Sequence, residues 1–433
     1  MMEEKNKYTA RQLAVLSLCR LEREGKYGNL EAGAAIKKFG LQGAEKALYT
    51  RLFYGVLERK ITLDYIISQY SDKPVSDMTY EMKNILRVSA YQLLYLDRIP
   101  EYSVVFEGVE LAKKYERKSA GSFVNAVLRR IAKNGMPEIK RGENSSEYLS
   151  VKYSVSEQIC GLLCDALGFD ETEKMLKADL SRKGVTLRVN TLKTTVSDLQ
   201  KLLSDNGIKS EPIKESDFGL KIDGYIDTET LFNLTDGLAY IEGASSQAAV
   251  TLLDVKSGMT VADVCAAPGG KTVSAAMEME NNGVIYAFDV HKNKLKLIEK
   301  TAAKTGVTII KTQEHDGREP LPELIGRCDR VICDVPCTGL GVIGNKPDMR
   351  YKEIDGVDRL INTQRAILKA SSTYLKKGSV MVYSTCTVLP SENGENVVDF
   401  IKNNADFELL YEKTYYPHVD GVDGFYTAKI IRK

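Results

Sequence analysis

Two cysteines in the C-terminal half follow apolar segments that have the character of buried strands. Cys337 closes the segment 334–337 (DVPC), and Cys386 follows a second apolar run. Open α/β sheets bind ligands beyond the carboxyl ends of their strands, so we expect both thiols in one cleft. Lys271 and the helix that starts beside it are expected to lower the pKa of such a thiol, which then attacks as the thiolate. A lone cysteine is more often simply buried, but two at neighbouring strand ends, one beside Asp334, predict nucleophilic catalysis.

A glycine-rich turn lies upstream of both cysteines. The letters VADVCAAPGGKT at 261–272 predict a short strand, a tight turn and the start of a helix. Gly269 and Gly270 lack side chains, so a ligand can approach the backbone, and the helix start offers unpaired N–H groups to a negative group. A second apolar strand ends in Asp289, at the spacing where a doubly wound fold binds ribose hydroxyls. The pattern predicts a nucleotide-like ligand.

Composition and charge favour a cytoplasmic protein of two or three domains. The chain has 433 residues and a net charge of +1, but residues 1–150 hold 25 Lys and Arg against 19 Asp and Glu, a bias of +6. This bias is compatible with an RNA-facing module at the N-terminal end. No apolar run of signal-peptide or transmembrane length occurs, and the eight cysteines are expected to be free thiols. Cys328, Cys333 and Cys337 lack the spacing of a zinc site, so no metal is predicted.

Hydrophobic periodicity divides the chain into three domains, 1–140, 141–242 and 243–433. Apolar residues at helical spacing recur through 5–134, which predicts an all-helical bundle. The middle domain has the pattern of linker helices and a small α+β unit with an antiparallel sheet, one common RNA-binding architecture. The β-α-β-α-β pattern of the last domain predicts a parallel sheet with crossover helices and a terminal strand pair. Its expected strands are 261–265, 284–289, 308–311, 330–334, 379–384, 407–411 and 425–431.

Together these motifs resemble one enzyme family. Pro336-Cys337 and Thr385-Cys386 are similar to the hallmark Pro-Cys and Thr-Cys motifs of the NOL1/NOP2/Sun family, which are S-adenosylmethionine-dependent RNA cytosine-5 methyltransferases. The resemblance implies an α/β fold: a class I, Rossmann-like methyltransferase domain with a mixed seven-stranded sheet. A small α+β, RRM-like subdomain and an all-α, NusB-like helical bundle precede it. The match extends over the turn 265–272 and the segments 187–190, 244–247 and 392–396.

The chemistry of this family explains the pair of thiols. Cytosine C5 is a poor nucleophile, and addition of a thiolate at C6 lets C5 take the methyl group. The resemblance implies that Cys386 forms this covalent adduct and that Cys337 assists the later elimination. Asp334 is implied to hydrogen-bond to or protonate the N3 side of the ring. Lys271 is implied to stabilise the thiolate or to help deprotonate the thiol.

The same resemblance assigns the cofactor contacts. Asp289 is expected on the ribose hydroxyls of S-adenosylmethionine, and Asp316 near its adenine. Asp334 is expected to border the cofactor as well. The backbone expected to hold the methionine end comprises Cys265, Ala266, Ala267, Pro268, Gly269, Gly270 and Lys271.

Contacts to substrate RNA are also implied. Arg188 and Asn190 belong to a family signature interpreted as RNA contact or support of the cleft. Arg350 lies in the segment 346–350, which resembles a loop over the cleft, and is expected to reach a phosphate. Tyr351 stands where relatives often carry Trp, so a stacking role there is not expected to transfer.

The fusion of a NusB-like domain to such a catalytic domain is characteristic of bacterial 16S rRNA methyltransferases. The implied function is therefore methylation of one cytosine, cytosine 967, in naked or partly assembled 16S rRNA by a monomer. A transfer RNA substrate is an open alternative. A non-catalytic RNA-binding or antitermination factor is a second, although such a module has no need of two thiols in one cleft. The loop at 334–337 argues against adenine amino methylation, which typically uses Asp/Asn-Pro-Pro-aromatic, and the Thr-Cys motif argues against a DNA cytosine methyltransferase.

Overall fold

The structure is a computed structural model that describes residues 8–25, 28–142, 144–181, 184–224, 226 and 228–433. Contacts divide the chain into two compact units, Met1–Leu176 with Lys346–Glu353 and Lys177–Asn345 with Ile354–Lys433. The predicted boundaries at 140 and 242 differ from this division. The helices after residue 140 group with the N-terminal bundle through Leu176, and the small sheet groups with the larger, seven-stranded sheet.

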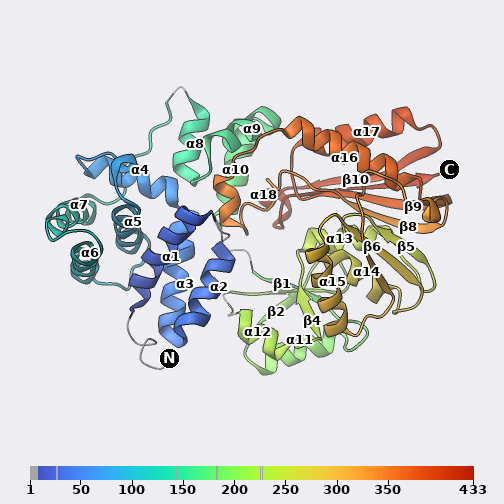
Figure 1. The fold of residues 1–433 in the computed structure, drawn as a ribbon, viewed down its shortest axis with the longest axis horizontal. Helices are drawn as coiled ribbons and strands as arrows, with labels where there is room; N and C mark the ends of the chain where they lie inside the picture. Colours follow the sequence, from blue (N-terminus) through green and yellow to red (C-terminus); the bar gives the residue numbers. More distant parts are fainter. Residues whose placement is uncertain (1–7, 26–27, 143, 182–183, 225, 227) are drawn as a thin grey trace. The chain divides into compact units, whose positions relative to one another are not determined.

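The first unit is helical, as its sequence periodicity predicts (Figure 1). Thr9 starts the first helix with a capping box, because its hydroxyl accepts the Gln12 N–H while the Gln12 side chain accepts the Thr9 N–H. The apolar faces of the helices pack into one core, in which Leu13, Phe53 and Ile85 are fully buried. The division between the two units falls within α10 (Phe169–Asp179). The other helices of this unit are α1 (Ala10–Glu24), α2 (Gly28–Phe39), α3 (Gly43–Glu58), α4 (Lys60–Tyr70), η1 (Val75–Asp77), α5 (Tyr80–Tyr95), α6 (Glu101–Tyr115), α7 (Ala120–Asn134), α8 (Ser145–Tyr153), α9 (Glu157–Leu167) and η3 (Pro347–Tyr351).

The second unit begins with a small antiparallel sheet of strand order β2-β3-β1-β4. The small α+β unit with an antiparallel sheet that the sequence predicts is present, and a further helix, α12 (Thr228–Leu234), precedes the last strand. Leu187, Leu220 and Leu199 bury the inner face of the sheet against α11. The elements are β1 (Thr186–Val189), α11 (Val196–Asp205), β2 (Ser210–Pro212), β3 (Gly219–Ile222), α12 (Thr228–Leu234) and β4 (Ala239–Ile241).

The larger sheet of this unit has the order β10-β11-β9-β8-β5-β6-β7. Strands β7, β6, β5, β8 and β9 are parallel, whereas β11 runs antiparallel to β9 and β10 antiparallel to β11. The predicted mixed seven-stranded sheet is confirmed, and the strand expected at 308–311 lies slightly later in the chain. The strands are β5 (Thr260–Asp263), β6 (Val284–Asp289), β7 (Ile310–Glu314), β8 (Cys328–Asp334), β9 (Leu375–Thr385), β10 (Phe407–Tyr415) and β11 (Phe425–Arg432).

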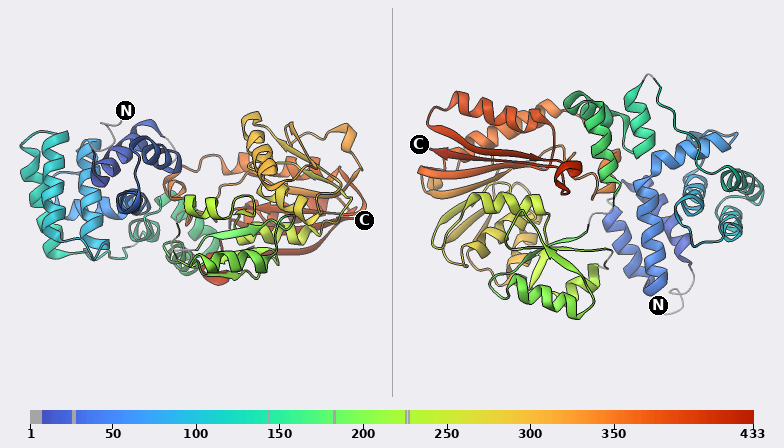
Figure 2. Two further views of the ribbon diagram at one scale, coloured as in Figure 1. Left: turned by 90° about the horizontal axis from the view of Figure 1, so that it is seen from below. Right: turned by 180° about the vertical axis from the view of Figure 1, so that it is seen from behind.

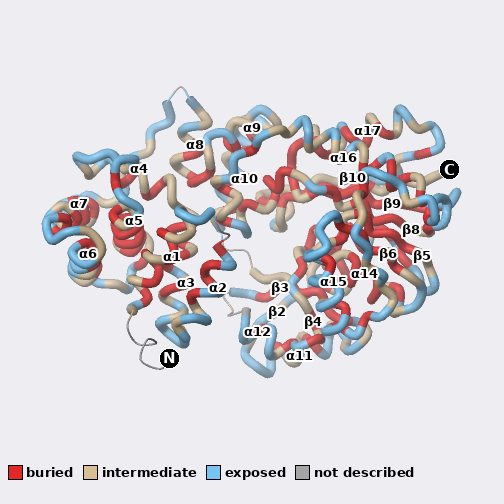
Figure 3. Tube along the Cα trace, in the orientation of Figure 1, coloured by how far each residue is buried: buried red, intermediate tan, exposed pale blue. Residues whose placement is uncertain are grey.

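Helices cover both faces of the larger sheet (Figure 2). Alternation along the strands explains this, because Val331 and Met381 pack toward α16 and α17, whereas the next residues, Ile332 and Val382, pack toward α13 and α14. The inner strands are accordingly buried along most of their length, whereas the edge strands β7 and β10 are largely exposed or half-buried (Figure 3). The helices are α13 (Ala244–Leu253), α14 (Gly270–Glu278), α15 (Lys292–Thr305), η2 (Pro322–Leu324), α16 (Val357–Ser372), η4 (Pro390–Glu392), α17 (Gly394–Asn403) and α18 (Pro417–Asp420).

Candidate active site

The two predicted thiols lie side by side at the carboxyl edge of the larger sheet. Strand β8 ends at Asp334, which is in register with Ser384 near the end of the parallel strand β9. The loops that follow place Cys337 Sγ 3.1 Å from Cys386 Sγ, and the Cys386 N–H donates to Cys337 Sγ at 3.2 Å. Both cysteines are partly exposed. The predicted proximity of the thiols is confirmed.

Lys271 contacts Asp334 rather than a thiol. Its ammonium donates to Asp334 Oδ2 at 2.7 Å, and the Ser384 hydroxyl donates to Asp334 Oδ1 at 2.6 Å. Burial lowers the pKa of Lys271, but the Asp334 carboxylate outweighs burial and raises that pKa above its usual value. A lysine with a raised pKa holds its proton, which argues against deprotonation of a thiol by Lys271. Lys271 is a fixed ammonium instead. That Lys271 stabilises a thiolate stays a prediction.

The thiol pKa also differs from the prediction. The hydrogen bond to Cys386 raises the pKa of Cys337 well above its usual value, and burial and the charges of Cys386, Glu392 and Asp334 raise it further. The adjacent thiols thus tend to leave a proton on Cys337.

The glycine-rich turn between β5 and α14, called the glycine cradle below, lies so close to neighbouring residues that a side chain at either glycine would crowd them. Gly269 has φ +106°, and a Cβ added there would lie 3.1 Å from Ile298 Cα. A Cβ added at Gly270 would lie 3.0 Å from Glu242 Oε1. Helix α14 starts at Gly270 with no side-chain cap, so its first N–H groups face the turn. Bare backbone and an uncapped helix start fit the methionine end of S-adenosylmethionine.

The two aspartates that the sequence predicts to contact the cofactor lie at or just after the ends of neighbouring strands. Asp289 ends β6, is 9% exposed, and accepts the His291 N–H on Oδ1 at 2.9 Å. Its position beside the turn fits the ribose of S-adenosylmethionine. Asp316 follows β7, where its carboxylate binds the Arg318 guanidinium, which lowers the pKa of Asp316. The contact of Asp316 with adenine stays a prediction.

Arg188 and Asn190 are structural. Arg188 is fully buried on β1, where its guanidinium donates to Glu278 at 3.0 Å and stacks over the Phe218 ring. Asn190 is also fully buried, and its amide donates to the carbonyl oxygens of Gly237 and Thr305. Residues without exposed surface cannot reach a phosphate. The prediction that they contact RNA is wrong, whereas support of the fold is what their bonds provide.

Arg350 is buried as well, within the helical unit. The segment Lys346–Glu353 belongs to this unit although it lies between two strands of the larger sheet in sequence. Arg350 is 0% exposed and donates to the Tyr153 carbonyl at 3.0 Å. Asp348 accepts the Gly28 N–H, and the Tyr351 hydroxyl donates to the Leu57 carbonyl at 2.7 Å. Arg350 therefore does not reach a phosphate, and these side chains anchor the segment to the helices.

Two buried carboxylates near the site were missed as functional candidates. Glu392 is fully buried and contacts the residue after Cys337, while Glu242 is 6% exposed and accepts the Ser274 hydroxyl at 2.6 Å beside Gly270. Glu392 lies in the segment 392–396, which belongs to the family resemblance, but the residues that hydrogen-bond to its carboxylate are distant in the sequence. The only indication in the sequence that Glu392 has a function was an acidic residue within a segment that is otherwise expected to be buried.

All eight cysteines are free thiols. Among the described residues, no group of three or more His, Cys, Asp or Glu side chains is placed to hold a metal ion. Within the same part of the chain, no helix is both long and apolar enough to cross a membrane.

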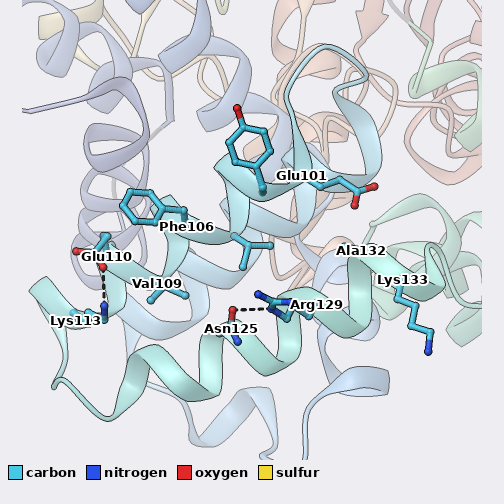
Figure 4. A pocket seen from close by; sticks show the side chains of 11 residues that line it. Glu101, Phe106, Val109, Glu110, Lys113, Asn125, Arg129, Ala132 and Lys133 are labelled. Carbon is cyan, nitrogen blue, oxygen red and sulfur yellow. Dashed lines mark hydrogen bonds and ion pairs between the residues drawn. The ribbon is translucent and has the colours of Figure 1, made fainter.

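The helical unit carries a hollow between α6 and α7 (Figure 4). Tyr102 and Phe106 are 79% and 64% exposed at its wall. Arg129 and Lys133 line the α7 side, and Arg129 donates to Asn125 at 3.1 Å. Exposed rings beside cations are a combination that single-stranded nucleic acids use for stacking and phosphate contact.

Three family models match the chain. The model described as 16S rRNA methyltransferase RsmB/F matches residues 250–431, and the NusB family matches residues 8–133. The ferredoxin-like domain of RsmF/B-like methyltransferases matches residues 161–229. These matches agree with the catalytic sheet, the helical bundle and the small α+β unit.

Curated relatives match over the whole chain. The probable ribosomal RNA small subunit methyltransferase B of Bacillus subtilis is 36% identical over 99% of this chain and 99% of its own. The Synechocystis protein with the same name is 32% identical over 98% of this chain and 99% of its own.

Solved structures show the same architecture. The crystal structure of PH0851 superposes with a TM-score of 0.81 at 26% identity, over 98% of this chain and 99% of that one. NSun6 from Pyrococcus horikoshii with SFG shares the fold, with a TM-score of 0.55 at 23% identity over 67% of this chain and 98% of that one. The thiol pair, the glycine cradle and the full-length similarity to these relatives all indicate the same family. The chain belongs to the ribosomal RNA small subunit methyltransferase B family, and it is an RNA methyltransferase that uses S-adenosylmethionine.

Proposed function

We propose that this protein methylates C5 of one cytosine in 16S rRNA, cytosine 967, through a covalent bond between Cys386 Sγ and C6 of the base. The observation that carries the proposal is the 3.1 Å separation of the Cys337 and Cys386 sulfurs at adjoining strand ends. The names of the full-length relatives support a small-subunit rRNA substrate.

The proton between the two thiols supports one order of action. Cys337 retains it because its pKa is raised, so Cys386 is the thiolate that adds to C6. S-adenosylmethionine, when bound, supplies the methyl group as a sulfonium to the C5 carbon that this addition has made electron-rich. Once Cys386 is bonded to C6, it no longer accepts the Cys337 proton and no longer carries charge. The pKa of Cys337 then falls, and its proton passes to solvent.

Elimination completes the reaction. The Cys337 thiolate takes the C5 proton, the C5–H electron pair re-forms the C5–C6 double bond, and the C6–S bond breaks to release Cys386 as thiolate. Asp334 is held in place by Lys271 and Ser384, and its carboxylate accepts a hydrogen bond from the N3 side of the ring when that side is protonated. The target base must leave its stack to reach these groups.

The helical unit supplies RNA contacts at the hollow between α6 and α7. Arg129 and Lys133 neutralise phosphates, and the exposed rings of Tyr102 and Phe106 stack on unpaired bases. These contacts lie on side chains that are available to solvent, unlike those of Arg188 and Arg350.

The test is methyl transfer from labelled S-adenosylmethionine to naked 16S rRNA, with the product mapped by bisulfite sequencing. The wild-type protein is expected to form one 5-methylcytosine. Cys386→Ala is expected to give no product, and Cys337→Ala a trapped RNA–protein adduct, because elimination is blocked after addition. Transfer only to transfer RNA would overturn the rRNA target, label on adenine would overturn the thiol mechanism, and adduct formation by Cys386→Ala would reverse the thiol roles.

A further inference from the structure

Glu392, at the end of η4, binds the loop that carries Cys337. Its carboxylate is fully buried and accepts the Thr338 N–H at 2.9 Å on Oε2. The Thr338 hydroxyl donates to Oε1 of the same carboxylate. Thr338 is the residue directly after Cys337, so Glu392 fixes the backbone and the side chain next to that thiol.

The hydrogen bonds continue to the loop that carries Cys386. Thr338 Oγ1 lies 2.9 Å from Thr387 Oγ1, and Thr387 directly follows Cys386. A carboxylate only accepts hydrogen bonds, so Thr338 must donate to Glu392 and Thr387 must donate to Thr338. A second link joins the loops, because the Gly341 N–H donates to the Cys386 carbonyl at 3.0 Å. The carboxylate thus sets the direction of a chain that crosses from one thiol loop to the other.

Glu392 is itself held from several sides. Gln364 on α16 donates from Nε2 to Glu392 Oε2 at 2.8 Å and to the Pro336 carbonyl, just before Cys337, at 2.9 Å. The Tyr383 hydroxyl and the Asn396 amide both donate to the Glu392 carbonyl. Rigid partners on a helix and on β9 therefore determine where the carboxylate lies.

Burial of a carboxylate is strongly unfavourable unless donors compensate it. Three donor groups do so here, and hydrogen bonds to a charged acceptor are stronger than neutral ones. An apolar side chain in its place would leave the Thr338 N–H and one Gln364 N–H without this acceptor. These donors are best satisfied by a carboxylate at position 392. Each donor either directly follows Cys337, as Thr338 does, or also binds the Cys337 loop, as Gln364 does.

We propose that Glu392 is a positioning residue that fixes the distance between the Cys337 and Cys386 sulfurs for methyl transfer. This inference rests on the proposed function for its catalytic consequence, but the distance it concerns can be measured without RNA. Glu392 touches neither the glycine cradle nor Asp289 in the contacts that define it, so cofactor binding is expected to be independent of it.

The test compares Glu392→Gln with Glu395→Gln, the same change at an exposed position three residues later. Glutamine keeps an oxygen that can accept the Thr338 N–H and Gln364, but its NH2 group takes the place of the oxygen that accepts the Thr338 hydroxyl. The Thr338 hydroxyl can then no longer donate to residue 392, and the direction of the hydrogen-bond chain to Thr387 is no longer fixed. We expect kcat to fall by about 10- to 100-fold, the effect of a misplacement near 1 Å, with KM for S-adenosylmethionine unchanged. Glu395→Gln is expected to behave as the wild type.

Thiol cross-linking gives a readout that needs no methyl transfer. Diamide, a diazene, takes two electrons and two protons from the two thiols and becomes a hydrazine, leaving a Cys337–Cys386 disulfide that peptide mass mapping identifies. A bond of about 2 Å is close to the sulfur separation of 3.1 Å, so the wild type is expected to cross-link rapidly. Glu392→Gln is expected to cross-link about tenfold more slowly, and Glu395→Gln at the wild-type rate.

A threonine pair keeps the test valid if Glu392→Gln does not fold. Thr338→Val keeps the shape of the side chain and removes the hydroxyl link, so it should slow cross-linking and lower kcat. Thr338→Ser keeps a hydroxyl, so both values should return toward those of the wild type. Wild-type cross-linking in Glu392→Gln, or slow cross-linking with unchanged kcat, would overturn the proposal. If the wild-type protein methylates no RNA, the proposed function fails, while the cross-linking rates still report on the position of the thiols.

Discussion

Lys271 and Asp334 form an ion pair at the edge of the larger sheet, with 2.7 Å between Nζ and Oδ2. The pair joins the first residues of α14 to the end of β8, and so links the cofactor turn to the loop of Cys337. The charge of the Lys271 ammonium is compensated by the Asp334 carboxylate. The consequence is that Lys271 and Ser384 hold the Asp334 carboxylate in place, three residues before Cys337.

Asp334→Asn is expected to reduce kcat by about 100-fold, since it removes a preorganised charge from the reacting base. The same change should make Cys337 more reactive, because the Asp334 charge raises the pKa of Cys337 and its loss lowers that pKa. Methyl transfer measures the first effect. Iodoacetamide modification against pH, in a Cys386→Ser background, measures the second. The exposed Asp355→Asn is the control, and a midpoint that moves to higher pH would contradict this account.

Asp263 is expected to make stability depend on pH. Burial raises the pKa of Asp263 from 3.8 to about 7, although the Thr272 hydroxyl opposes the shift. The raised pKa means that the folded state disfavours the charge. This destabilisation is absent below pH 3.8, grows as pH rises and is complete above the folded pKa near 7.

Asp263→Asn removes this penalty and keeps an acceptor for Thr272. From about pH 5.5 to pH 8, its free energy of unfolding relative to wild type should therefore rise by about 2 kcal/mol. Urea unfolding at several pH values measures the difference. Asp355→Asn serves again as the exposed control, and a difference that stays constant with pH would show that the carboxyl titrates normally.

The thiol pair was predictable because it depends only on topology. Parallel strands end at the same edge, so the residues after β8 and β9 had to meet, and the periodicity of the sequence was sufficient to find both strands. The choice of partner for Lys271 was not predictable, since Asp334 and the thiols share that edge and a shift of an ångström or two decides between them.

The arginine assignments failed for a different reason. A charged residue in a motif suggests RNA, but Arg188 pairs with Glu278 and Arg350 packs against Tyr153, 90 and 197 positions away in the chain. Burial is a tertiary property that no local pattern reveals. The same limit hid Glu392, whose donors come from α16 and from the loop after β8.

Gly269→Ala is expected to destabilise the fold and weaken cofactor binding. A side chain at φ +106° is strained, at a cost of about 1–2 kcal/mol, and its Cβ would also crowd Ile298 at 3.1 Å. Gly258→Ala is the matched control, because Gly258 has φ +85° and an added Cβ there meets no atom within 4 Å. Urea unfolding and titration with S-adenosylmethionine measure the two effects. The loss of affinity should occur only in Gly269→Ala, and equal loss in both variants would mean that backbone strain, not the cradle, controls binding.

Arg129 and Lys133 are expected to contribute to RNA affinity through the hollow between α6 and α7. The double change Arg129→Ala with Lys133→Ala should weaken binding of 16S rRNA and lower the slope of log affinity against log salt by about 1 to 2, since each phosphate contact releases close to one counterion. Lys37→Ala with Lys38→Ala is the control, because it removes the same charge from exposed positions on α2. Filter binding over a series of salt concentrations gives both slopes. An unchanged slope in the first variant, or equal changes in the two, would mean that the helical unit attracts RNA only through its overall charge and that the hollow is not an RNA contact.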